Sequence, residues 1–184
     1  YITIAFTFRS FSQPILLFCL MPVSLIGVAW GHWIHGFPVN ILSLLGVIAL
    51  IGIMVNDGLV LIGKFNNNLK QNFNFNEGLI DAGKSRFRAI FLTTATTVAG
   101  LTPLLLEKSR QAQWLKPMAI SVSYGIAFAT ILTLILLPIF ISLNNDLKVI
   151  FKWLVSGNYP DKEVVERAII EKKEEQKMDQ MNNP

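Results

Sequence analysis

Apolar residues come in four long runs over the first 143 positions of the chain, separated by short polar segments. A hydrocarbon core about 30 Å thick needs about 20 mostly apolar residues of helix. Four runs meet this requirement, over about residues 14–33, 41–65, 87–106 and 118–143. Residues 1–8 have the composition of the end of a preceding span. The pattern predicts an all-α, polytopic membrane helix bundle with four full transmembrane helices and the end of another.

After residue 143 the chain changes from apolar to charged. Residues 144–154 mix apolar side chains with lysines, which predicts that the chain turns there into a helix at the membrane interface. Residues 161–180 are rich in Glu and Lys, and their apolar positions have helical spacing. We therefore divide the chain into a transmembrane bundle, residues 1–143, and a cytoplasmic charged tail, residues 144–184. The tail is expected to be solvated and partly helical or disordered; the alternative is a helix that docks on a partner.

The composition agrees with a membrane protein, because 52% of the residues are hydrophobic and 15% are charged, against about 25% charged in soluble domains. The net charge of +4 is carried by short loops and the tail. No basic patch is interleaved with aromatic residues, so we expect the lipid bilayer as a partner and no nucleic acid. The single cysteine, Cys19, excludes an intrachain disulfide and a cysteine metal cluster. A buried packing role is expected for it.

His32 and His35 lie at the end of a span, with no carboxylate nearby in the sequence. We interpret them as interface residues rather than metal ligands, and we expect neither a metal nor another cofactor. In the loop before the third span, Asn76 is predicted to cap a helix that runs on into that span.

The distribution of Lys and Arg in the short loops predicts the orientation of the bundle. Positive residues are most frequent between the second and third spans and at the start of the tail. They are Lys64, Lys70, Lys84, Arg86, Arg88, Lys148 and Lys152. The opposite side carries fewer, so the richer side and the C-terminus are predicted to be cytoplasmic.

The second span contains an unusual polar pair. Asp57 is the one charged residue between Ile41 and Ile62, and Asn56 precedes it. An Asp at the centre of a membrane helix costs about 2.5–3.5 kcal/mol. The pair either provides interhelical hydrogen bonds for packing or belongs to an ion or proton relay inside a bundle. Gly52 and Gly58 give the same span smooth faces for helix packing.

The third span offers a wall for such a relay. Arg86, Thr93 and Gly100 are seven residues apart, which places them almost in line on one helix face. Thr96 and Gly100 form a pair of small residues that allows another helix to approach. In the alternative interpretation, Arg86 is an ordinary positive-inside anchor and the threonines bond to their own helix.

Several motifs together resemble the resistance-nodulation-division (RND) transporters. They are residues 52–62 (GIMVNDGLVLI), 77–82 (EGLIDA), 86–88 (RFR), Thr93-Thr94, 100–104 (GLTPL), Gly125 and 132–138 (LTLILLP). Their order and spacing are similar to the last helices of that fold, from the end of the eighth helix to the twelfth. The resemblance covers about residues 1–143 and leaves the tail uncovered.

The resemblance implies a proton-driven export pump of the bacterial inner membrane, which is a secondary active transporter and not an enzyme. It also implies a homotrimer and, in multidrug members, a periplasmic adaptor and an outer-membrane channel. The family's relay lysine falls on Asn56, its relay arginine on Arg86 and its threonine on Thr93. The paired aspartates would come from an N-terminal half that this chain lacks, so we expect the chain to be a fragment. Asn56 removes a cation from the relay, and Asp57 adds a carboxylate.

Two other functions are compatible with the residues. One is a non-transporting membrane scaffold or a lipid-sensing relative of the same fold. The other is an intramembrane aspartyl protease, which needs two aspartates sharing a water. No other predicted span contains an aspartate, so this second alternative is the weaker.

Overall fold

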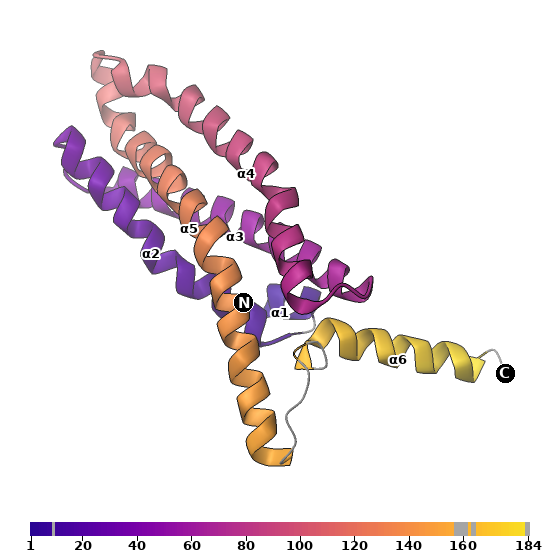
Figure 1. Ribbon diagram of the computed structural model, residues 1–184. Helices are drawn as coiled ribbons and strands as arrows, with labels where there is room; N and C mark the ends of the chain where they lie inside the picture. Colours follow the sequence, from indigo (N-terminus) through magenta and orange to yellow (C-terminus); the bar gives the residue numbers. More distant parts are fainter. Residues whose placement is uncertain (9, 157–161, 163–164, 183–184) are drawn as a thin grey trace.

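The computed structural model describes residues 1–8, 10–156, 162 and 165–182. The described residues form helices connected by short turns, and no strand occurs among them (Figure 1). The helices are α1 (Ile2–Phe8), α2 (Ser12–His35), α3 (Ile41–Lys70), α4 (Phe75–Leu106), α5 (Arg110–Ser156) and α6 (Arg167–Asn182).

Four of these helices, α2 to α5, are long and apolar enough to cross a membrane. The predicted fold class, an all-α polytopic bundle, is therefore confirmed. We call the end of the bundle where α2 begins and α3 ends the tail end, because α6 lies there. The opposite end, with the α2–α3 and α4–α5 turns, is the turn end (Figure 1).

Two helix boundaries differ from the sequence prediction. Helix α4 begins at Phe75, after Asn74 in the capping position, so Asn76 is not the cap. Helix α5 continues through residue 144 to Ser156 without the predicted turn. Its continuation is packed, because Asn145 and Val149 are 0% and 1% exposed. The predicted division into two domains thus falls inside one continuous helix.

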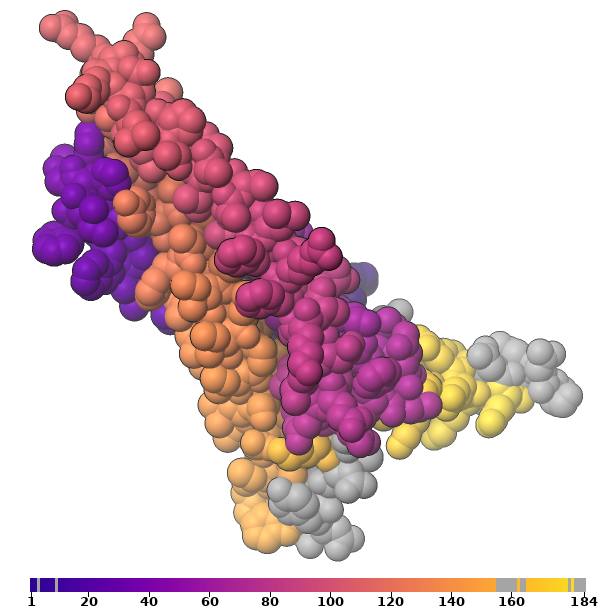
Figure 2. Space-filling view, turned by 45° about the horizontal axis from the view of Figure 1, so that its top comes forward, coloured from indigo at the N-terminus to yellow at the C-terminus, as the bar shows by residue number. Residues whose placement is uncertain are grey.

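Helix α5 is the centre of the bundle and lies against α2, α3 and α4 (Figure 1). Helix α4 covers one side of it. Figure 2 shows α4 as a ridge of side chains along the face in view, beside α5. Only 11% of the most apolar stretch of α4 is buried, against 39% for α2. Much of α4 therefore presents its surface outward.

The α2–α3 turn is fixed by helix caps at both of its ends. Gly36 ends α2 with φ 66°, a left-handed conformation that glycine adopts without steric cost. Asn40 begins α3 with a capping box, in which its side chain accepts from the Ser43 amide and the Ser43 hydroxyl accepts from the Asn40 amide. These bonds satisfy amides that would otherwise lack partners at the start of the helix.

The α4–α5 turn is ordered by Glu107. Its carboxylate accepts from the amides of Ser109 and Lys108, at 3.0 and 2.9 Å. The Ser109 and Lys108 amides stabilise the charged form and hold the pKa of Glu107 below its ordinary value. Hydrogen bonds to an ionised carboxylate therefore stabilise the turn at neutral pH.

The close crossing of α2 and α5 depends on glycines. A Cβ atom on Gly27 would lie 2.5 Å from Phe128 Cβ, and one on Gly31 would lie 2.7 Å from Tyr124 Cβ. Real Cβ atoms do not approach other atoms so closely, so these two positions need glycine. The spacing is a small-xxx-small pattern, which lets helix backbones approach in membranes.

Cys19 is exposed on α2, so the expectation of a buried packing role is wrong. An apolar run is equally suited to packing inside a protein and to contact with lipid, so the sequence alone did not reveal this exposure. His32 is buried where α2 contacts α5. Its Nδ1 faces Phe37 O and its Nε2 faces Ser121 Oγ, both at 3.0 Å.

Candidate functional site

Helix α3 carries the candidate pair on a face that the rest of the chain does not cover. Asn56 is exposed and Asp57 is partly exposed, whereas Met54 and Gly58 on the neighbouring face are buried. Within the described part of the chain, neither the Asn56 nor the Asp57 side chain forms a hydrogen bond or an ion pair. Polar side chains in membrane helices usually pair with one another or face a bundle interior, so a partner for this pair outside the chain stays a prediction.

Helix α4 holds Arg86 on the side that packs against its neighbours. The residues one turn before and one turn after it, Ala82 and Ile90, are 0% and 3% exposed. Arg86 itself is partly buried, and its Nε atom is buried without a hydrogen-bond partner in the described structure. An unpaired buried guanidinium N–H is costly. Arg86 therefore has an unused donor aimed into the protein.

The hydroxyl of Thr93 bonds to its own helix. Thr93 is exposed, and its Oγ1 donates to Ala89 O at 3.0 Å. Thr96 and Thr97 bond back in the same way, to Leu92 O or Thr93 O. This is the arrangement expected for the alternative interpretation of the threonines. The oxygen of Thr93 still has a free lone pair, so it remains able to accept a hydrogen bond.

The turn between α3 and α4 sets the relative depth of these residues. Phe65 and Phe75 pack edge to face with ring centroids 5.4 Å apart, which aligns the two helices at that level. With a rise of about 1.5 Å per residue, Asp57 lies about 12 Å along α3 from this level and Arg86 about 16 Å along α4. Thr93 lies about 27 Å along α4. Asp57 and Arg86 thus lie within about one helical turn of each other in depth, and Thr93 is two turns beyond Arg86.

No hydrogen bond or ion pair joins the α3 pair to Arg86 or Thr93 among the residues that the structure describes. The described residues also contain no group of three or more His, Cys, Asp or Glu that would hold a metal ion. What the chain presents is a set of polar groups from two adjacent helices at similar depth, each lacking a partner on the other helix. Such a set has the chemistry of one wall of a site.

The candidate packing residues divide into two kinds. Gly58 is buried, and a Cβ atom there would collide with the side chain of Leu17 on α2. Gly52 and Gly100 are exposed and have nothing within 4 Å of an added Cβ. Thr96 is exposed as well. Packing at Gly52, Thr96 and Gly100 therefore stays a prediction about helices outside this chain.

The structure also forms two polar contacts to α5 that the sequence did not predict. Thr94, next to Thr93, is buried and shares a short hydroxyl–hydroxyl bond with Thr130 of α5. His35 bonds to the Tyr124 hydroxyl at 3.0 Å, with the two rings edge to face. The glycine spacing at Gly27 and Gly31 was a usable sequence signal for the α2–α5 crossing. No sequence signal indicated that Thr94, rather than Thr93, is the buried threonine.

With this geometry established, the relatives of the chain become informative. The chain matches the AcrB/AcrD/AcrF family over residues 1–144, and it belongs to this family of RND transporters. The predicted resemblance is confirmed. Residues 145–184, which include the end of α5 and all of α6, lie outside the match.

Two curated relatives show the same extent of similarity. The swarming motility protein SwrC of Bacillus subtilis is 29% identical over 140 residues, which is 76% of this chain and 13% of SwrC. The cobalt-zinc-cadmium resistance protein CzcA of Cupriavidus metallidurans is 28% identical over 132 residues, 72% of this chain and 12% of CzcA. The chain thus spans about an eighth of the length of these relatives.

Proposed function

We propose that this chain is part of a proton-driven export pump of the bacterial inner membrane. In this proposal α3 and α4 form one half of an intramembrane proton relay, with Asn56, Asp57, Arg86 and Thr93 as its residues. An N-terminal half supplies the other wall, and the C-terminus lies in the cytoplasm. The assembled pump is a homotrimer that works with a periplasmic adaptor and an outer-membrane channel.

One observation carries the proposal. Asn56 and Asp57 are unpaired on an uncovered face of α3, at the depth where Arg86 holds an unused donor on α4. Ionisable groups within membrane helices are costly and typically mark ion or proton pathways. Membership of a transporter family supports such a role, since a secondary transporter draws the energy for uphill export from a coupled ion. Asp57 is the only side chain of the four that titrates as an acid.

The relatives support export without choosing a cargo. The name of one refers to swarming motility and that of the other to resistance to cobalt, zinc and cadmium. Since the chain spans only about an eighth of each, the cargo-binding parts of the pump lie elsewhere. The proposal therefore names proton-coupled export and no particular cargo.

The test uses the full-length protein in liposomes that contain a pH-sensitive dye. A proton gradient is imposed, and zinc ions or ethidium are added as two probe cargoes. We expect cargo-dependent proton flux in the natural protein and its loss in Asp57→Asn, which keeps the size of the side chain and removes its titration. Cargo movement that ignores the proton gradient, or full flux in Asp57→Asn, would contradict the proposal. Absence of flux with a folded protein that still binds lipid would favour the scaffold alternative.

A further inference from the structure

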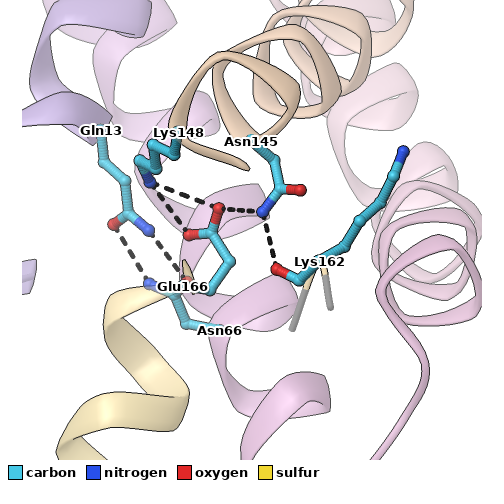
Figure 3. Close-up of polar contacts among 6 residues, drawn as sticks. All are labelled: Gln13, Asn66, Asn145, Lys148, Lys162 and Glu166. Atoms are coloured by element: carbon cyan, nitrogen blue, oxygen red, sulfur yellow. Dashed lines mark hydrogen bonds and ion pairs between the residues drawn. The ribbon is translucent and has the colours of Figure 1, made fainter. Parts of the chain in front are cut away.

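A buried carboxylate ties the C-terminal segment to α5. Glu166 is 3% exposed, although it lies in a segment rich in charge. It accepts from Asn145 Nδ2 at 2.8 Å, and both of its oxygens face Lys148 Nζ at 3.3 Å (Figure 3). Asn145 Nδ2 also donates to the Lys162 carbonyl at 2.9 Å. A carboxylate is buried at low cost only when it is paired and hydrogen-bonded in this way.

The first turns of α6 attach the same segment to α3. Lys70 near the end of α3 pairs with Glu171 at 2.9 Å. Lys172 donates to Lys70 O and to Asn72 Oδ1, both at 2.7 Å. A lysine on the last carbonyls of a helix also interacts favourably with the helix dipole. Ala168, between these attachments, is 5% exposed and belongs to the hydrophobic core.

A third contact extends this polar layer to α2. The side-chain amides of Gln13 and Asn66 bond to each other reciprocally, at 3.0 and 3.2 Å. Figure 3 draws this pair together with the Glu166 contacts. Gln13 is 5% exposed. The tail end of the bundle is therefore cross-linked by polar contacts from α5, through the C-terminal segment, to α3 and α2.

Most of the residues that make these attachments lie beyond the part of the chain that matches the family. The family match ends at residue 144, one position before Asn145. Glu166, Lys148 and α6 all lie beyond it. The contacts join the tail end to α3 itself, the helix that carries Asn56 and Asp57 about 13 to 20 Å further along its axis from residues 66–70.

We propose that Glu166, Ala168, Glu171 and Lys172 form a strap that fixes the tail end of α5 to the tail end of α3 and thereby holds α3 in position during transport. The attachment to α5 includes the buried Glu166–Lys148 pair and a second ion pair, between Lys162 and Asp146 at 2.8 Å. The attachment to α3 caps the end of that helix. The strap is a positioning device: it touches neither the relay nor a cargo. Its effect on transport rests on the proposed function, whereas its mechanical effect does not.

The experiment measures the distance between the two helix ends directly. Gln71 and Ile150, both exposed, are replaced by cysteine and spin-labelled in the full-length protein, whose other cysteines have been removed, in lipid nanodiscs. Pulsed electron resonance gives the distance distribution. We expect one narrow distribution in the parent protein and a broader one with a longer mean in Glu166→Ala. Glu166→Gln, which keeps the shape and the Asn145 contact, should give an intermediate width.

Two further variants make the result specific. Glu174→Ala removes an exposed carboxylate that pairs only weakly, within α6, with Arg167, so its distribution should match the parent. Exchanging the pair, Lys148→Glu with Glu166→Lys, should restore part of the narrow distribution that either single change loses. An unchanged distribution in folded Glu166→Ala protein, or equal broadening by Glu174→Ala, would overturn the strap.

Measuring transport distinguishes a failure of the strap from a failure of the proposed function. We expect slower cargo-dependent proton flux in Glu166→Ala than in Glu174→Ala. If the helix ends separate and the flux stays unchanged, the strap does not position α3 for transport and that part of the proposal is wrong. If Asp57→Asn leaves the flux intact, the relay is wrong, and the distance measurement still decides whether the strap exists.

Discussion

We call the contact between α2 and α5 the seam. It differs from the outward faces of α3 and α4 in where its polar groups find their partners. In the seam, Gly27 and Gly31 admit Tyr124 and Phe128, and His32 bonds to Ser121. Its polar groups find partners within the chain. On the outward faces, Asn56 and Asp57 have no partner and Gly52 and Gly100 face open space.

The difference shows which part of the chain is complete by itself. A buried polar group in a bilayer has no water to bond with, so it needs a protein partner. The seam meets this demand internally and acts as a scaffold. The outward faces meet it only when another element covers them. Variants in the two regions should therefore fail differently: seam variants in stability, and outward-face variants in transport.

The largest effect on stability is expected at the tail end, where, as in the seam, the polar groups have partners within the chain. Lys148→Met leaves Glu166 buried without its cation, which should lower the free energy of unfolding by about 3 kcal/mol, the low end for buried pairs because the Lys148 side chain is 22% exposed. Lys152→Met, on an exposed neighbour, is the control and should change it little. Thermal unfolding of the full-length protein in detergent measures both, and equal shifts would contradict the buried pair.

The seam itself is tested by Gly27→Ala. The added methyl group meets Phe128 and Tyr124 at less than 3 Å, so overpacking should cost about 1–3 kcal/mol. Gly83→Ala, where an added Cβ meets nothing within 4 Å, should be neutral or slightly stabilising. Gly52→Ala sharpens the comparison in the same unfolding assay: a loss as large as that of Gly27→Ala would show that a helix outside this chain packs on α3.

The two arginines at the start of the third span test whether a positive residue there belongs to the relay or only anchors the helix at the membrane surface. Arg86 is partly buried with an unused donor, whereas Arg88 is exposed. We expect Arg86→Ala to lower proton-coupled flux about tenfold, equivalent to about 1.4 kcal/mol, and Arg88→Ala to lower it much less. Both variants should insert and fold similarly. Equal effects in the liposome assay would support the anchor interpretation for both arginines.

Adjacent threonines provide the finest comparison. Thr94→Val breaks the buried bond to Thr130 and should cost about 1 kcal/mol of stability, with little change in flux. Thr93→Val removes an exposed hydroxyl that bonds only to Ala89, and should lower flux with little change in stability. Unfolding and flux are measured on the same samples. A reversed pattern would place the relay on the Thr94 face.

The four spans were predictable because a bilayer sets a minimum length for an apolar helix. The same rule gives no maximum, which is why the continuation of α5 past residue 144 was missed. Residue spacing placed Thr93 in line with Arg86, and the assignment of these residues to a relay stays a prediction. Spacing did not reveal that Thr94 is the buried one of the two threonines, because neighbours differ by about 100° around a helix and α5 decides which side of α4 is covered.

The tail was the least predictable region. Its charged composition indicated a solvated segment, and most of α6 beyond Lys172 is exposed. The burial of Glu166 depends on Lys148 and Asn145, 18 and 21 residues earlier. Such a pairing requires the chain to return to α5, and no local pattern encodes the return. The alternative interpretation, a docking helix, is closer to the structure, although the surface on which α6 docks belongs to this chain.

The continuity of α5 has a consequence for how the protein sits in the bilayer. One exposed stripe of large apolar residues runs along this helix at every fourth position, with side chains 52–59% exposed. It consists of Ile131, Ile135, Ile139, Leu143 and Leu147. The stripe does not change where the apolar run of the sequence ends, so this side of α5 carries no mark of the membrane surface. The apolar surface of α5 alone therefore leaves its depth undefined, and we expect the attachments at the tail end to help fix it.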